Sequence, residues 1–324
     1  MRRDGPRPFS FYVLAGVFGL FVLFLYGPTL TILALSFQGP QGGLTFPMNG
    51  VSTFWFSRLW AGLGVVDIWA AFRRSLALGL VVMGLTVTIA FFAGLAFRKG
   101  FLGQTPLFYV AVASLIVPSI VVSLGIGLEF RLIDEGIKVL AARTGWGFLQ
   151  DHGTVMGLFT SALGAHLTWT LPFGLLIMFA VFNRFNPAYE EAARDLGATG
   201  PQSLRHVVVP IILPSLVGVA LFGFTLSWDE LARTSQAIGG RNTLPLELQG
   251  LTTTVTTPEI YALGTVTTGV SLLVIGLSFG SFLAIQRRRA RRPTFDTATS
   301  PNGSARGVGG VKPERAQALK CRTP

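Results

Sequence analysis

The chain has few charged residues and almost no histidine or cysteine. Charged residues make up 13% of its 324 residues, about half the share of a soluble domain, whereas hydrophobic residues make up 50%. With three histidines, the chain has few residues from which to build a metal centre. It also contains no serine–histidine–aspartate or paired-carboxylate pattern of the kind that indicates an enzyme. The single cysteine, Cys321, excludes a disulfide framework within the chain. We therefore expect a membrane protein without a catalytic or metal site of its own.

Six long stretches without Asp, Glu, Lys or Arg dominate the chain. They are Phe9–Phe37, Ser75–Phe97, Gly100–Leu128, Gly153–Asn183, His206–Trp228 and Ile260–Gln286. The shortest has 23 residues, which as a helix reach roughly 35 Å and can cross a hydrocarbon core of about 30 Å. The first stretch is too long for the roughly 7–15-residue core of a signal peptide, so we expect an uncleaved helix. The sequence thus predicts an all-α, polytopic membrane protein of about six transmembrane helices.

The distribution of basic residues indicates which side each loop occupies. Ten of the 26 Lys and Arg residues follow Ile285, where they indicate a cytoplasmic anchor rather than a nucleic-acid surface. With both termini in the cytoplasm, 18 of the 26 lie inside. The outer segments are then Gln38–Arg74, Glu129–His152 and Asp229–Glu259. We expect a cytoplasmic start and first helix in 1–37, an outer loop in 38–71, a transmembrane domain in 72–286, and a disordered basic tail in 287–324.

The polar segment 186–205, between the fourth and fifth stretches, carries the signals of two short helices. Asn186 can cap the first helix. Gly197 suits a helix end that needs a left-handed conformation. Thr199, followed three residues later by Gln202, predicts a capping box for the second helix. A loop that merely connects two spans would not need two capped helices.

This segment resembles the EAA motif of inner-membrane permease subunits of binding-protein-dependent ABC importers. Its spacing is complete: Glu191-Ala192-Ala193, then Gly197, then after nine residues Val207–Val209 and Pro210. The resemblance implies a type I ABC importer permease fold with cytoplasmic coupling helices between spans four and five, which dock in a groove of an ATPase subunit. The residues that it implies in this coupling are Glu190, Glu191, Ala192, Ala193 and Gly197.

The resemblance extends over nearly the whole chain and points to the second permease subunit of spermidine/putrescine-type systems. It is carried by Ser36-Phe37, Ser52–Leu59, Phe224–Pro245 and Thr257–Leu263. It implies a polyamine solute, a second permease subunit, an extracytoplasmic solute-binding protein and a cytoplasmic ATPase dimer that uses ATP and Mg, in the bacterial inner membrane. That subfamily has Asn-Ser-Leu where this chain has Arg74-Ser75-Leu76, and Trp228 is a second departure. Ferric iron, an opine-like compound or another small organic solute therefore stays open.

The power for transport is expected to come from a partner, because no nucleotide-binding G-x-x-x-x-G-K-[ST] motif occurs. A stand-alone secondary transporter would need ionisable groups within its spans. Here the six stretches hold only His166 and His206. We interpret His166 as a packed, hydrogen-bonded neutral imidazole, and expect no cofactor bound by this chain.

The outer segments hold carboxylates that would attract a cationic solute. Asp229 and Glu230 directly follow the fifth stretch, so we predict that they face the solute path, together with Trp228 and Glu129. The alternative is that these are ordinary solvated charges. Aromatic residues such as Trp169 can stack on a cation, although an interfacial belt is their more common role.

Overall fold

The computed structural model describes residues 8–62, 67–146, 152–254 and 257–290, and the regular elements in those residues are all helices. In chain order they are α1 (Phe9–Leu35), α2 (Phe54–Ala61), α3 (Ile68–Lys99), α4 (Gln104–Ala113), α5 (Ser119–Thr144), the π-turn η1 (Leu158–Ala162), α7 (Leu163–Arg184), α8 (Ala188–Asp195), α9 (Gly200–Ser203), the π-turn η2 (Leu204–Val208), α10 (Val209–Trp228), α11 (Leu244–Thr254) and α12 (Glu259–Ala290). The chain divides into two units, Met1–Phe282 and Leu283–Pro324. The second unit contributes only the end of α12 to the described residues. The all-α class is confirmed.

Five helical segments of the described chain are long and apolar enough to cross a membrane. They are Phe9–Leu35, Ile68–Lys99, Leu158–Arg184, Gly200–Trp228 and Glu259–Ser281. These segments coincide with five of the six charge-free stretches. The chain is therefore a multi-pass membrane protein.

The third charge-free stretch, Gly100–Leu128, does not form a single spanning helix. It is divided between α4 and α5 by a turn that ends at Pro118. Proline lacks an N–H and disfavours helical geometry in the residue before it, so the helix stops there and restarts. The Ser114 hydroxyl fastens this turn to α7 by donating to the carbonyl oxygen of Thr168 at 2.7 Å. The break has both a local cause and a tertiary anchor.

Helix α5 continues well beyond the expected end of the third stretch. It runs to Thr144, through most of the predicted outer segment Glu129–His152, and Gly145 ends it with a φ of +68°. Most side chains of this extension are exposed, among them Glu129, Arg131, Glu135 and Lys138, whereas Asp134 is buried. The charge-free stretch ends at Leu128 although the helix does not, because charge marks the end of an apolar stretch and not of a helix.

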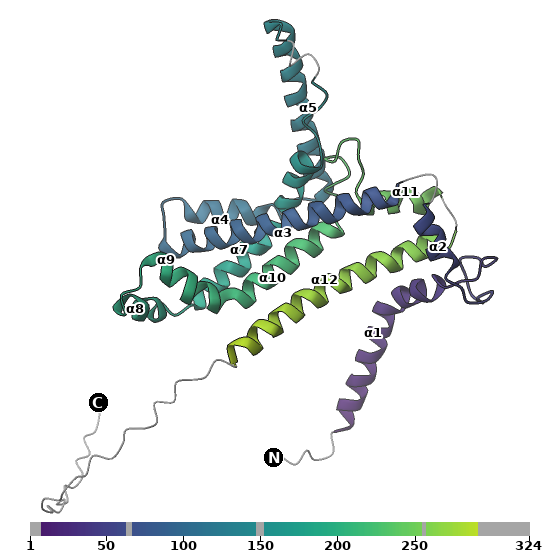
Figure 1. The fold of residues 1–324 in the computed structure, drawn as a ribbon, viewed down its shortest axis with the longest axis horizontal. Coiled ribbons are helices and arrows are strands. Elements are labelled where there is room, and N and C mark those ends of the chain that lie inside the picture. Colours follow the sequence, from purple (N-terminus) through teal and green to yellow (C-terminus); the bar gives the residue numbers. More distant parts are fainter. Residues whose placement is uncertain (1–7, 63–66, 147–151, 255–256, 291–324) are drawn as a thin grey trace, which may run out of the picture. The chain divides into compact units, whose positions relative to one another are not determined.

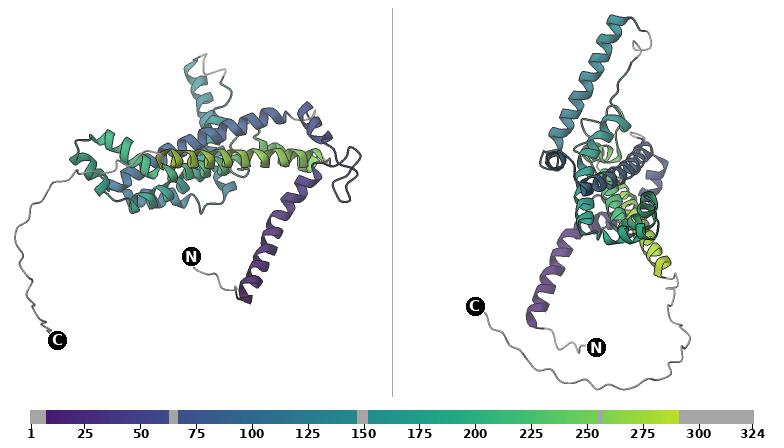
Figure 2. Two further views of the ribbon diagram at one scale, coloured as in Figure 1. Left: turned by 60° about the horizontal axis from the view of Figure 1, so that its bottom comes forward. Right: turned by 90° about the vertical axis from the view of Figure 1, so that its left-hand side faces the viewer.

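Helices α3, α7 and α10 pack against one another and form the core of the first unit (Figures 1 and 2). A buried hydrogen bond of 2.8 Å joins the hydroxyls of Thr86 in α3 and Thr170 in α7. At Gly174 in α7, an added Cβ would lie 2.9 Å from the Cβ of Ala90 and 3.3 Å from Val219. Small residues of this kind let helix backbones approach closely, which drives helix association in lipid. The three helices therefore form one closely packed body.

Short helices lie at the two ends of this bundle (Figure 1). Helices α8 and α9 contact each other and η2 at the end where α3 finishes, which we call the α8 end. Helix α11 packs on α3 near its start, and Leu244 N donates to Ser75 Oγ there at 2.8 Å. We call this opposite side the α11 end. The functional residues gather at these two ends.

Helix α1 is apolar around its whole circumference, and among its residues only Leu35 is buried. A helix of this composition and length suits a lipid environment. At the other end of the chain, α12 continues to Ala290, so the first four residues of the expected tail are helical. The remainder of that tail, 291–324, lies outside the described residues.

Candidate functional site: the α8 and α11 ends of the bundle

The segment between α7 and α10 folds locally as its sequence predicts. The Asn186 side chain accepts a hydrogen bond from Ala188 N at 3.0 Å at the start of α8. Gly197 has a φ of +85° and reverses the chain after this helix. Thr199 N donates to Gln202 Oε1 at 2.8 Å, completing a capping box that opens α9. Both short helices are thus fixed by their own capping residues.

Helix α8 carries a face without a partner in the described chain. Glu191 and Ala192 are exposed, and the Glu191 carboxylate makes no ion pair among the described residues. Next to them, Leu196 is 90% exposed and Tyr189 is also exposed. Apolar side chains clustered on an exposed, structured surface are typical of protein interfaces. This face is suited to dock against another protein.

Glu190 points the other way, toward the bundle. Its carboxylate accepts hydrogen bonds from both terminal nitrogens of Arg98, at 2.7 and 3.0 Å. The guanidinium of Arg98 also lies 4.9 Å from the ring centre of Phe185. Since Arg98 is the penultimate residue of α3, this bidentate pair ties α8 to the end of the longest core helix.

At the α11 end, Asp229 opens into a cavity of about 610 Å³ between α10, α11 and α12. The lining residues are Thr225, Trp228, Asp229, Leu231, Leu244, Pro245, Leu248, Gln249, Thr252, Thr267, Thr268 and Ser271. Asp229 is the one charged residue among them. Partial desolvation raises the pKa of its carboxyl above the ordinary value, although the residue stays exposed. The cavity therefore offers one carboxylate and several hydroxyl acceptors.

The two neighbours of Asp229 have structural partners. Trp228 is buried between the rings of Phe72 and Phe224, with centroid distances of 5.5 and 5.7 Å. The Glu230 carboxylate accepts a hydrogen bond from Arg233 N at 2.8 Å and holds the turn after α10. Of the three consecutive residues, only Asp229 presents a free charge to the cavity.

A buried polar network joins α7 to the turn that follows α10. The Thr234 hydroxyl donates to the Glu230 carbonyl at 2.8 Å, so it accepts from His166 Nε2, also at 2.8 Å. Nδ1 of His166 is then the acceptor for the Ser227 hydroxyl at 2.8 Å. Both ring nitrogens are used by one neutral tautomer, which agrees with a packed imidazole rather than a proton relay.

Arg233 is completely buried beside this network. Its guanidinium donates to Thr168 Oγ1 at 2.7 Å and to the Ser114 carbonyl at 3.3 Å. It also lies 4.8 Å from the ring centre of Trp169. The Trp169 ring, which could have stacked on a cationic solute, thus already stacks on Arg233 of the same chain.

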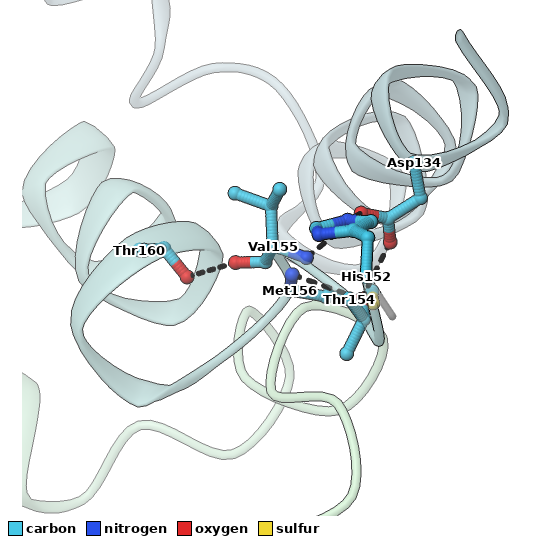
Figure 3. Close-up of polar contacts among 6 residues, drawn as sticks. All are labelled: Asp134, His152, Thr154, Val155, Met156 and Thr160. Atoms are coloured by element: carbon cyan, nitrogen blue, oxygen red, sulfur yellow. Dashed lines mark hydrogen bonds and ion pairs between the residues drawn. The ribbon is translucent and has the colours of Figure 1, made fainter. Parts of the chain in front are cut away.

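Asp134 fastens the loop before η1 to α5 (Figure 3). Its carboxylate accepts from the Thr154 hydroxyl, from Val155 N at 2.7 Å and from His152 Nε2 at 3.0 Å. These hydrogen bonds, above all that from Thr154, lower the pKa of Asp134 to about 2. The ionised Asp134 therefore fastens residues 152–155 to α5 at neutral pH.

Residues 86–292 match the model of the family described as binding-protein-dependent transport system inner membrane component. This match covers more than half of the chain. The chain belongs to this family. The resemblance drawn from the EAA motif is confirmed, and the protein is an inner-membrane permease of an ABC importer.

The permease is 30% identical over 263 residues to the spermidine/putrescine transport system permease protein PotC of Haemophilus influenzae. This alignment covers 79% of the present chain and 90% of that protein. It is 28% identical over 272 residues to the putrescine transport system permease protein PotI of Escherichia coli K12, covering 83% and 90%. Its fold is similar to the crystal structure of a bacterial ABC transporter involved in the import of the acidic polysaccharide alginate, with a TM-score of 0.54 and 16% identity over 90% of this chain and 100% of that one.

The structure brings some of the predicted site residues together and separates others. Glu190, Glu191 and Gly197 all lie in the capped segment of the permease, although Glu190 faces its own bundle. Glu129 is exposed on α5 and does not line the cavity of Asp229. Among the described residues no three His, Cys, Asp or Glu side chains could hold a metal ion.

The contacts of two buried or half-buried arginines were not predicted from the sequence. Arg98 pairs with Glu190, which is 92 positions away. Arg233 follows the fifth stretch, where a solvated charge is expected, yet it is buried. The spacing of residues along a chain carries no signal for either pairing. An arginine close to the end of an apolar stretch is the only hint the sequence offers.

Proposed function

We propose that this permease forms one half of the translocation pathway of an ATP-driven importer for a polyamine such as spermidine or putrescine. The observation that carries the coupling role is the unpartnered face of α8 around Glu191, held by caps at both ends of the segment. The polyamine is supported by the names of the two relatives, which align with about four fifths of the chain.

The proposed orientation places the α8 end and both termini in the cytoplasm. An ATPase dimer, which uses ATP and Mg, docks there on α8. A second permease subunit completes the pathway, and an extracytoplasmic solute-binding protein delivers the solute to the α11 end. The permease has no catalytic role in this scheme: it moves when the ATPase moves, because α8 is tied to α3 through Arg98 and Glu190.

Asp229 is the proposed contact for the solute. Protonated amines are donors only, so they need carboxylate or hydroxyl acceptors. The cavity of Asp229 supplies both, with Thr225, Thr252 and Thr268 among its walls. The other predicted path residues contribute less directly, since Trp228 is packed between rings and Glu230 caps a turn.

The solute is tested by measuring ligand binding to the importer's partner solute-binding protein. Spermidine and putrescine are expected to bind, and an anion or a ferric complex to show no binding. Binding of an anion or a ferric complex but not of the polyamines would overturn the polyamine assignment while leaving the coupling role intact.

Coupling is tested with the reconstituted importer, by measuring the ATPase activity that the loaded binding protein stimulates. Glu191→Gln and Gly197→Val are expected to abolish this stimulation without preventing membrane insertion. Asp195→Asn is the matched control, because Asp195 is an exposed carboxylate on the same helix. Normal stimulation in both test variants would refute the role of this segment.

A further inference from the structure

A second pocket, of about 770 Å³, lies at the α11 end and shares no lining residue with the cavity of Asp229. Its walls are the first turns of α3, the loop and start of η1, and the segment after the α10 turn. The lining residues are Ala70, Arg73, Arg74, Ala77, Thr154, Met156, Gly157, Leu158, Phe159, Ile238, Gly240 and Arg241. We call it the arginine pocket, after Arg73, Arg74 and Arg241.

The arginine pocket concentrates positive charge without compensation. Arg74 uses its Nε to donate to the Asn242 carbonyl at 2.7 Å. Arg73 and Arg241 are exposed and have no hydrogen bond or ion pair among the described residues. None of the lining residues is acidic. Like charges that converge from separate segments repel one another, so an anionic partner would relieve this cost.

The walls of the pocket are held in place by polar contacts with neighbouring segments. Asp134 binds the lining residue Thr154 and the following backbone N–H (Figure 3), and Met156 N donates to Thr154 Oγ1 at 3.0 Å. The Ser161 hydroxyl donates to the carbonyl of Ala237, which joins the second wall to the third. A site whose walls are fixed in advance loses little conformational entropy when a ligand binds.

The side of the membrane on which this pocket lies follows from the proposed function, on which this inference rests. With the α8 end in the cytoplasm, the arginine pocket is extracytoplasmic. Only eight of the 26 Lys and Arg residues lie on that side, where basic residues are ordinarily depleted. Three of those eight line this single pocket. Membrane orientation therefore does not account for them.

We propose that the arginine pocket is a docking site for carboxylate side chains of the solute-binding protein. The guanidinium fork matches a carboxylate with two parallel hydrogen bonds. The third wall and the part of the second wall before Leu158 lie beyond the ends of the spans, so the pocket would open toward the extracytoplasmic aqueous space where that protein arrives. A cationic solute would be repelled here, which separates this pocket from the solute contact at Asp229.

The test measures the affinity of the solute-binding protein for the complete importer in nanodiscs of neutral phosphatidylcholine. Arg73→Gln together with Arg241→Gln is expected to raise the Kd about 10-fold or more and to weaken its salt dependence. Both side chains are exposed, so the fold should tolerate the change. Arg73→Lys with Arg241→Lys keeps the charge and should give an intermediate Kd. Arg131→Gln, an exposed arginine of α5 outside the pocket, is the matched control.

Each result decides between the pocket and its alternatives. Binding by the wild-type importer tests the proposed function, and the difference between wild type and variant tests the pocket alone. An unchanged Kd in the Arg73/Arg241 glutamine variant would overturn the proposal. An equal loss in Arg131→Gln would show general charge attraction and would overturn it as well.

Two other anions are distinguished by the same variants. If the pocket holds a lipid phosphate, wild-type importer in nanodiscs that contain phosphatidylglycerol will retain that lipid and the glutamine variant will not. The Kd of the solute-binding protein will then be the same for both. If it selects an anionic solute, the variant will change which solutes are taken up while the Kd again stays constant. Either pattern would refute docking.

Discussion

The ion pair between Arg98 and Glu190 allows a quantitative prediction. Its side chains are 22% and 16% exposed, so the pair lies between a surface pair, worth up to about 1 kcal/mol, and a buried pair, whose disruption costs about 3–5 kcal/mol. The bidentate geometry places it above the surface range. We expect the pair to contribute about 1–2 kcal/mol to holding α8 in its docking position.

The perturbation is a double-mutant cycle with Arg98→Gln and Glu190→Gln. If α8 must be ordered before the ATPase can dock, a loss of about 1.4 kcal/mol raises the Kd of the ATPase subunit for the permease about tenfold. Each single variant should show this loss, and the double variant should be no weaker than either. The charge exchange, Arg98→Glu with Glu190→Arg, should recover part of the affinity.

The assay is the equilibrium binding of the ATPase subunit to the permease in nanodiscs. Glu191→Gln provides a comparison, because Glu191 faces away from Arg98 and its effect should add to that of Arg98→Gln. If the effects of Arg98→Gln and Glu190→Gln simply add, the two residues act separately. The idea that the pair positions α8 would then be refuted.

Three further predictions concern single residues. Asp229→Asn should lower polyamine uptake about tenfold or more, whereas Glu129→Gln should leave it unchanged. Because partial desolvation raises the pKa of Asp229, wild-type uptake should fall as the pH is lowered, at a higher pH than for an ordinary aspartate, and Asp229→Asn should lack this dependence in a proteoliposome assay. Gly174→Ala adds a Cβ 2.9 Å from a neighbouring side chain and should destabilise the permease by about 1–3 kcal/mol in thermal unfolding; Gly164→Ala, with nothing within 4 Å, should not. Asp134 has a pKa lowered from 3.8 to about 2, so its contribution to stability should be present at neutral pH and be lost as the pH falls from about 4 to 2; Asp134→Asn should raise hydrogen exchange in residues 152–157 at pH 7.

The features that sequence predicted well are those set by neighbouring residues. The caps around Gly197 need only the few residues that precede and follow it, and both are as expected. Five charge-free stretches became spanning helices because lipid leaves the backbone no alternative to internal hydrogen bonds. The family motif needs only spacing along the chain, and so it too was visible from the sequence.

The features that sequence missed depend on contacts between distant segments. The break before Pro118 is anchored by Thr168 of another helix, and α5 persists beyond Leu128, where the charge-free stretch ends. Glu190 and Glu191 are adjacent and chemically identical, yet one faces Arg98 and the other faces away. Only the helix direction and the position of α3 distinguish them.

The close packing at Gly174 has a consequence for how the permease moves. Helices packed as closely as α3, α7 and α10 are around Gly174 cannot slide past one another without forcing side chains together. The three core helices should therefore tilt as a lever. Helix α3 has 32 residues, or roughly 48 Å, so a tilt of about 10° around its α8 end would carry its far end through roughly 8 Å. A small movement of α8 on the ATPase would thus produce a larger displacement at the α11 end of the pathway.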